Sequence, residues 1–140
     1  MILVVDASVA VKWLLWRTQI EPDYEIALRI LEESDSGRIR IMQPPHWRAE
    51  VLAVIARLEP AMAGDALDLL NRAEKQVLGT DAVYTRAVQL SHRLGHHLFD
   101  TLYHAVALEA GARLVTADER YFSVAKSEGA IQSLSDFKIA

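Results

Sequence analysis

The sequence predicts a single α/β domain over residues 1–140, built on a small, mainly parallel β-sheet that helices cover on both faces. Three observations lead to this prediction. Short runs of β-favouring aliphatic residues alternate with longer segments of helical periodicity, which is the pattern of βα units. The helical segments outnumber the strands, so the sheet is expected to be small. A chain of 140 residues, 51% of them hydrophobic, can bury a full core as one domain.

The first half of the chain opens with a strand. Ile2–Val5 is an unbroken aliphatic run, as in strands buried on both faces. Ser8 is a candidate N-cap for the helix that follows, and Pro22 is a candidate first-turn residue for a second helix, ended by Gly37. The later elements of this half are expected at residues 9–16 (helix), 22–37 (helix), 39–42 (strand), 46–58 (helix) and 62–74 (helix).

The second half repeats the alternation. Thr80 or Asp81 is the expected cap of a long helix that ends at Gly95, and Asp100 is expected to open the next helix. The predicted elements are residues 76–78 (strand), 80–95 (helix), 100–111 (helix), 113–116 (strand), 119–127 (helix) and an edge strand within 130–139. Strand and helix in this order favour a parallel sheet.

Composition excludes several classes of function. The net charge is −4, whereas proteins that wrap duplex DNA without specificity are usually basic. With no cysteine, disulfides, thiol nucleophiles and thiolate metal sites are excluded. Apolar stretches fall short of the roughly 20 residues of a membrane span, and Asp6 interrupts an N-terminus without a basic region. We therefore expect a soluble, cytoplasmic protein.

Four acidic residues are the candidates for function: Asp6, Glu50, Asp100 and Asp118. Asp6 and Asp118 directly follow predicted strands, and ligands of open α/β sheets bind outside the carboxyl ends of strands. Glu50 borders an apolar helical stripe without Lys or Arg three or four residues away, so its partner should lie elsewhere in the fold. Asp100 stands in a first helical turn, where the helix dipole alone favours a carboxylate, with His104 on the same face. Each acid taken singly also has a plain interpretation as a turn, cap or solvated residue.

Convergence of these acids would call for a cation. Two unit charges about 4 Å apart repel by about 1 kcal/mol in water and about 4 kcal/mol at an effective dielectric constant of 20. Oxygen ligands without cysteine indicate Mg²⁺ or Mn²⁺, and such a site suits phosphodiester hydrolysis. Ser8 and Thr116 lie two residues from an acid. Their hydroxyls are open to two interpretations, as holders of a metal-bound water or phosphate oxygen, or as helix caps.

Other side chains carry weaker signals. His92, His96 and His97 have a spacing that suits a polar loop better than a zinc site, because Gly95 is expected to end the helix between them. Basic residues near the predicted site are candidates for contacts to a nucleic-acid backbone. They are Lys12, Arg17, Arg48, Arg86, Arg93 and Arg120.

The four acids and their settings resemble the PIN-domain family, and within it the small VapC-type toxins of toxin–antitoxin pairs. The matching segments run along the whole chain. They are Val5-Asp6-Ala7-Ser8-Val9, Lys12-Trp13, Pro44-Pro45 before Glu50-Val51-Leu52, Phe99-Asp100-Thr101-Leu102-Tyr103, and Leu114-Val115-Thr116-Ala117-Asp118. The last two segments and the spacing between their aspartates are the most specific part. This chain departs from many relatives at Ala53, Phe99 and His104. These departures leave the four acids intact and concern substrate choice and the hydrogen bonds around the acids.

The resemblance implies a Mg²⁺- or Mn²⁺-dependent endoribonuclease with a PIN-like fold, commonly a homodimer and held inactive by a VapB-type antitoxin. By this resemblance, Asp6, Glu50, Asp100 and Asp118 match the metal-binding catalytic acids, and Ser8 and Thr116 match polar positions beside them. Two rivals are a PIN-fold binding module without turnover and a receiver-like phosphoacceptor domain. The second lacks its paired acid and late lysine here.

Overall fold

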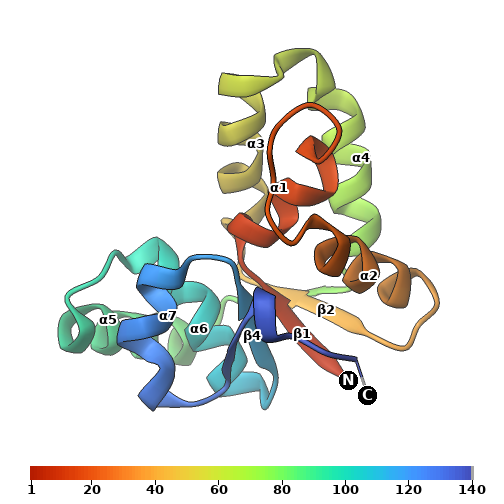
Figure 1. Ribbon diagram of the computed structural model, residues 1–140. Coiled ribbons are helices and arrows are strands. Elements are labelled where there is room, and N and C mark those ends of the chain that lie inside the picture. Colours follow the sequence, from red (N-terminus) through yellow and green to blue (C-terminus); the bar gives the residue numbers. More distant parts are fainter. Residues whose placement is uncertain (140) are drawn as a thin grey trace.

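The computed structural model describes residues 1–139 and confirms the α/β class with a wholly parallel sheet (Figure 1). Five strands lie in the order β3-β2-β1-β4-β5. Their bounds are β1 Ile2–Val5, β2 Arg40–Gln43, β3 Gln76–Val77, β4 Arg113–Thr116 and β5 Ile131–Ser133. Because parallel neighbours need long crossovers, helices connect the strands, as the alternating pattern predicts.

Helices surround the sheet. Their bounds are α1 Ala7–Leu15, α2 Tyr24–Asp35, α3 Trp47–Leu58, α4 Ala63–Ala73, α5 Asp81–Leu94, α6 Leu98–Ala110 and α7 Glu119–Ala125. Short 3-10 turns lie at Pro60–Met62, Lys126–Glu128 and Leu134–Asp136. In Figure 1, α1–α4 gather above the sheet and α5–α7 lie to its left, so the two groups flank the carboxyl ends of the central strands.

The core runs through the two central strands. Leu3, Val4 and Val5 of β1, with Leu114 and Val115 of β4, are fully buried. An aliphatic strand covered on both faces gains burial at every position, which explains why these segments read as unbroken apolar runs. The buried strands β1 and β4 therefore fix the positions of the segments that follow them, which lead into α1 and α7.

A glutamine side chain replaces main-chain pairing at the carboxyl end of β1. The β1–β2 ladder pairs Ile2 with Arg40 and Leu3 with Ile41. Beyond it, the Val5 N–H donates to Gln43 Oε1 and Gln43 Nε2 donates to the Val5 carbonyl, both at 2.8 Å. Gln43 is fully buried, so its amide satisfies both polar groups of Val5 as a peptide unit would.

Several predicted boundaries need correction. Ser8 is not the cap of the first helix: Asp6 is, because its carboxylate accepts from the Ser8 N–H at 3.0 Å and α1 begins at Ala7. The second helix begins at Tyr24 rather than Pro22, because Asp23 before it takes a left-handed conformation with φ 58°. Helix α6 begins at Leu98, so Asp100 lies within its first turn instead of opening it. Among residues 1–139, no helix has the length and apolarity needed to cross a membrane.

Candidate active site

Two of the four acids are brought together by the central strands. Strands β1 and β4 are parallel neighbours with Val5 opposite Val115, and the Asp6 N–H donates to the Val115 carbonyl at 3.1 Å. Asp6 follows β1 directly and Asp118 lies two residues beyond β4. Both carboxylates therefore lie at the same edge of the sheet, each at the N-terminus of the helix that follows its strand.

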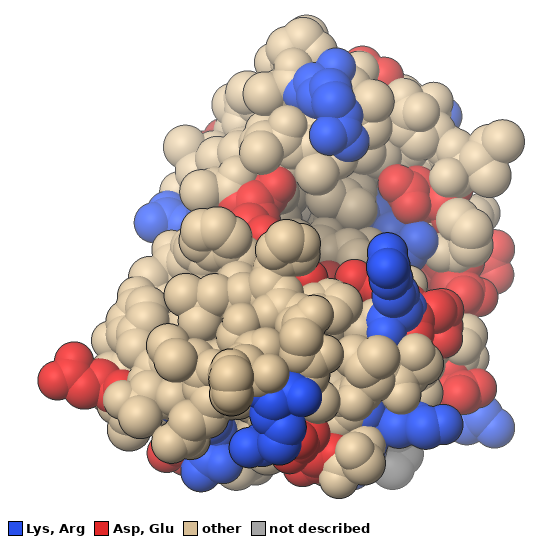
Figure 2. Space-filling model, turned by 90° about the vertical axis from the view of Figure 1, so that its left-hand side faces the viewer, with Lys and Arg blue, Asp and Glu red and all other residues tan. Residues whose placement is uncertain are grey.

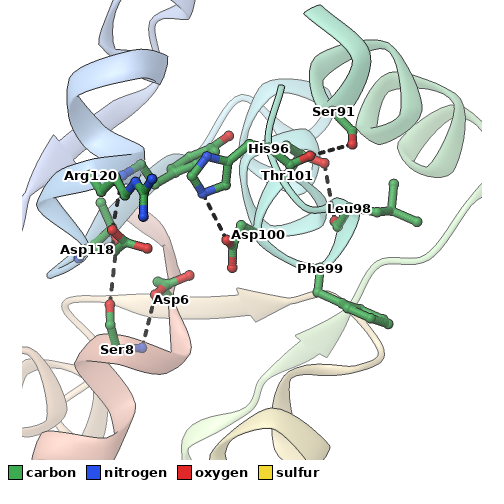
Figure 3. Close-up of polar contacts among 12 residues, drawn as sticks. Asp6, Ser8, Ser91, His96, Leu98, Phe99, Asp100, Thr101, Asp118 and Arg120 are labelled. Atoms are coloured by element: carbon green, nitrogen blue, oxygen red, sulfur yellow. Dashed lines mark hydrogen bonds and ion pairs between the residues drawn. The ribbon is translucent and has the colours of Figure 1, made fainter. Parts of the chain in front are cut away.

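Each aspartate is oriented by capping its helix. Asp6 Oδ2 accepts from the Ser8 N–H and Asp118 Oδ1 accepts from the Tyr121 N–H, both at 3.0 Å. Within residues 1–139, the second oxygen of each carboxylate accepts no hydrogen bond. One oxygen thus fixes the side chain, and Figure 3 shows the two carboxylates in one region with Asp100.

The hydroxyls of Ser8 and Thr116 join the two strand ends. The Ala117 N–H donates to Ser8 Oγ at 3.0 Å, and the Asp118 N–H donates to Thr116 Oγ1 at 3.0 Å. The two hydroxyls lie 3.5 Å apart. The interpretation as helix caps is wrong, because Asp6 and Asp118 are the caps, and both hydroxyls instead accept from the backbone that leads into Asp118.

Glu50 reaches the site from α3. Its Oε1 accepts from Tyr103 Oη at 2.7 Å and lies 3.3 Å from His46 Nε2. Tyr103 is fully buried on α6, so the glutamate finds the distant partner that its sequence neighbours do not supply. Burial and the nearby charges of Asp6 and Glu50 hold the pKa of the Tyr103 hydroxyl far above its usual range, which keeps this group a hydrogen-bond donor.

The pKa values show that the carboxylates act on one another. Burial raises the pKa of Asp6 to about 6, and the charges of Asp100 and Glu50 add to the rise. Burial also raises the pKa of Asp100, helped by Glu50 and Asp118 and opposed by His96. Neighbouring negative charges disfavour ionisation, so four acids from four separate elements share one electrostatic environment.

His96 lies against two of the acids, which sequence reasoning missed. Its Nε2 is 3.1 Å from Asp100 Oδ2 (Figure 3). One ligand atom each from His96, Asp100 and Asp118 lie within 4.8 Å of one another. The only sequence signal was the spacing of four residues between His96 and Asp100, and it crosses the break between α5 and α6.

The histidine expected on the same face as Asp100 points elsewhere. His104 is fully buried, with Nε2 2.7 Å from the Gly129 carbonyl and Nδ1 2.8 Å from Tyr121 Oη. Because a carbonyl can only accept, Nε2 carries the proton and Nδ1 accepts from the tyrosine. Burial lowers the pKa of His104, in keeping with a neutral ring that positions Tyr121.

The site opens to solvent as a cleft. A hollow of about 450 Å³ is lined by His96, His97, Asp100, Asp118 and Arg120, among others. Figure 2 shows this side of the molecule hollowed between its upper and lower parts, with acidic side chains at the floor and margin. A shallower hollow of about 280 Å³ lies beside Glu50, with His46 and Phe99 in its wall. Phe99 is 59% exposed.

Of the six basic residues expected near the site, one lines the cleft and the other five have partners elsewhere. Arg120 lines the cleft beside Asp118. Four others lie within 4 Å of carboxylates outside the four-acid set, and Arg17 lies over the Trp16 ring at 4.7 Å. The four pairs are Lys12 with Glu21, Arg48 with Glu74, Arg86 with Glu109 and Arg93 with Glu128.

Removing the Tyr103 hydroxyl tests how Glu50 is held. We expect Tyr103→Phe to lower the free energy of unfolding by about 1 kcal/mol, because one buried hydrogen bond is lost. Any activity that uses Glu50 should fall by roughly tenfold as the carboxylate loses its fixed orientation. Urea unfolding and a rate assay measure the two effects. An unchanged rate in a folded variant would show that Tyr103 does not position a working glutamate.

Comparison with known proteins gives a family and a fold. The sequence profile described as PIN domain matches residues 3–127. No curated protein matches the sequence significantly. Among solved structures, VapBC-1 from nontypeable Haemophilus influenzae is similar with a TM-score of 0.66 and 16% identity, over 97% of this chain and 100% of that chain. VapBC2 from Rickettsia felis, bound to a DNA fragment from their promoter, gives 0.67 and 14%, over 95% and 98%. Sequence identities this low show a shared fold and nothing more specific.

Proposed function

This chain belongs to the PIN-domain family, and from that premise we propose that it is a metal-dependent endoribonuclease that hydrolyses RNA phosphodiester bonds. The proposed catalytic residues are Asp6, Glu50, Asp100 and Asp118. The observation that carries the proposal is the convergence of these carboxylates: Asp6 and Asp118 follow adjacent parallel strands, and one oxygen each of Asp100 and Asp118 lie within 4.8 Å of each other. Perturbed acids in a cleft are typical of functional sites.

The donor set fits a divalent cation. Carboxylate oxygens are the ligands that Mg²⁺ and Mn²⁺ take in proteins, and the caps on Asp6 and Asp118 leave one oxygen of each available. We propose Asp6, Asp100 and Asp118 as the principal ligands, with Glu50 as a ligand through water or as the base that orients water. When bound, the ion supplies an activated water and charge stabilisation for phosphoryl transfer.

The surrounding residues would hold these groups and the substrate. Tyr103 donates to Glu50 and limits its movement. Arg120 lines the cleft beside Asp118, where a guanidinium would pair with a backbone phosphate. Phe99 presents an exposed ring next to Glu50, and single-stranded RNA is commonly held by stacking of bases on aromatic side chains. These features favour a single-stranded substrate.

We further propose that the protein is a VapC-like toxin, inhibited by a VapB-type antitoxin. Support comes from the fold shared with two VapBC assemblies across nearly the whole chain. A homodimer belongs to the same proposal. Helix α5 exposes Tyr84 and Val88 one turn apart, 42% and 57% exposed, and this apolar surface would suit a contact between subunits.

A cleavage assay on defined oligonucleotides tests the enzyme assignment. The purified chain would be incubated with single-stranded RNA, double-stranded RNA and single-stranded DNA, each with Mg²⁺, Mn²⁺ or EDTA. We expect internal cleavage of single-stranded RNA with either ion and none with EDTA. Stabilisation by the ions with all oligonucleotides intact would instead identify a binding module without turnover.

A further inference from the structure

We propose that His96 supplies a nitrogen ligand to the ion at the acidic site, and that the site therefore binds Mn²⁺ in preference to Mg²⁺. The inference rests on the proposed function only in taking the acidic site as an ion site. It assigns a role to a residue outside the four-acid set, one that this chain's own geometry places beside Asp100 and Asp118.

The distances fit an octahedral ion. Ligands about 2.1 Å from such an ion lie about 3 Å apart when adjacent and about 4.2 Å apart when opposite. His96 Nε2 and Asp100 Oδ2 are 3.1 Å apart, a hydrogen-bond distance in the metal-free protein, and two ligands in adjacent positions would keep this separation once the proton between them is displaced by the ion. All three ligand atoms of His96, Asp100 and Asp118 fall within 4.8 Å of one another, so one ion can reach them with little movement of the side chains.

The imidazole is held in this orientation by the fold. Its ring meets the Tyr121 ring edge-on, with centroids 4.8 Å apart and planes at 69°, and Tyr121 is fixed in turn by the buried His104. The backbone of His96 is also held, because its backbone N–H donates to the Ser91 carbonyl at 3.2 Å and Ser91 Oγ donates to the His96 carbonyl. A histidine side chain only 14% exposed is thus directed into the cleft rather than into solvent (Figure 3).

A nitrogen donor changes which ion the site prefers. Mg²⁺ takes oxygen ligands and retains several waters, whereas divalent ions of the first transition series also bind nitrogen donors, Mn²⁺ the most weakly of them. Mn²⁺ accepts the same carboxylates and the same octahedral arrangement. It also gains affinity from the imidazole nitrogen, which Mg²⁺ does not. An imidazole added to the proposed carboxylate ligands therefore favours Mn²⁺, where an all-carboxylate site would leave the two ions more nearly equal.

Ion binding without RNA tests the proposal. Affinities of the full chain for Mn²⁺ and Mg²⁺ would be measured by electron paramagnetic resonance and by competition, for the wild type and for His96→Gln. We expect His96→Gln to weaken Mn²⁺ binding about tenfold and Mg²⁺ binding by less than about twofold. His92→Gln, which alters an exposed histidine on the same helix-loop segment, is the matched control and should change neither affinity.

A direct spectroscopic readout needs no variant. Electron spin echo modulation of wild-type protein with bound Mn²⁺ should show coupling to ¹⁴N from the imidazole, and His96→Gln should lose it. Equal losses of both affinities with no ¹⁴N coupling would overturn the proposal and leave His96 as a positioning partner of Asp100. An RNA-cleaving protein without ¹⁴N coupling would contradict this inference alone, whereas a protein that binds neither ion would contradict the proposed function as well.

Discussion

Replacing Asp6 with asparagine is expected to reduce RNA cleavage by about a thousandfold or more while making the metal-free protein more stable at neutral pH. The loss follows because, in the proposed metal site, an amide cannot replace an anionic ligand. The gain follows because burial and the charges of Asp100 and Glu50 oppose ionisation of Asp6. Asparagine is as good an N-cap as aspartate, so its side-chain oxygen should keep the bond to the Ser8 N–H.

Rates and stability are both needed to interpret this variant. Cleavage would be measured under single-turnover conditions with Mg²⁺ and with Mn²⁺, and unfolding would be followed in urea with EDTA. Asp118→Asn should lose cleavage in the same way, because Asp118 is also a proposed ligand, and it should stay folded because asparagine can cap α7 as aspartate does. Asp68→Asn, which neutralises an exposed carboxylate on α4, is the control and should cleave normally. Cleavage by Asp6→Asn within tenfold of the wild type would remove Asp6 from the proposed ligands.

Divalent ions are expected to stabilise the protein strongly near pH 8 and weakly near pH 5. In the metal-free fold the pKa of Asp6 is about 6, against an ordinary value of 3.8. Protonation therefore favours the folded state, and the stability that Asp6 contributes is fully present below about pH 4 and lost as pH rises through 6. Since one pKa unit corresponds to about 1.4 kcal/mol, a rise from 3.8 to about 6 means that ionised Asp6 costs on the order of 3 kcal/mol without an ion.

Bound ion should reverse this cost where the site is ionised. At a concentration 100 times its dissociation constant, an ion that binds only the folded state adds about 2.7 kcal/mol. Protons compete for the same oxygens, so the gain should shrink as pH falls below 6. Urea unfolding at several pH values, with EDTA or saturating ion, measures the effect. Asp6→Asn lacks this titration, so the difference between wild type and variant isolates it, and a difference that stays constant from pH 4 to 8 would contradict the prediction.

The sequence predicts the sheet and the ends of its central strands well because the physics there is local. Ile2–Val5 is an apolar run of strand length and Arg113–Thr116 has the apolar centre Leu114-Val115, and the acid after each strand must lie at the carboxyl edge of a parallel sheet. That reasoning places Asp6 and Asp118 together. Capping was one plain interpretation of Asp6, but the sequence favoured Ser8 as the cap of the first helix, although both residues are good N-caps.

The rest of the site depends on how helices meet, which local patterns do not encode. His96 reaches Asp100 only because Gly95 takes a left-handed conformation with φ 62° and turns the chain between α5 and α6. His104 has the helical spacing to face Asp100 but is buried against Tyr121 and Gly129 instead. The partnership of Tyr103 with Glu50 likewise joins residues 53 positions apart.

The amide of Gln43 has a consequence for how this site can change over generations. It ties Val5, the neighbour of Asp6, to the segment that leads through Pro44 and Pro45 into the helix of Glu50. A hydrogen bond between two main chains survives almost any substitution, whereas one made by a side chain is lost with a single codon change. The tie between the strand that leads to Asp6 and the segment that leads to Glu50 therefore depends on main-chain pairing at one end and on a single replaceable side chain at the other.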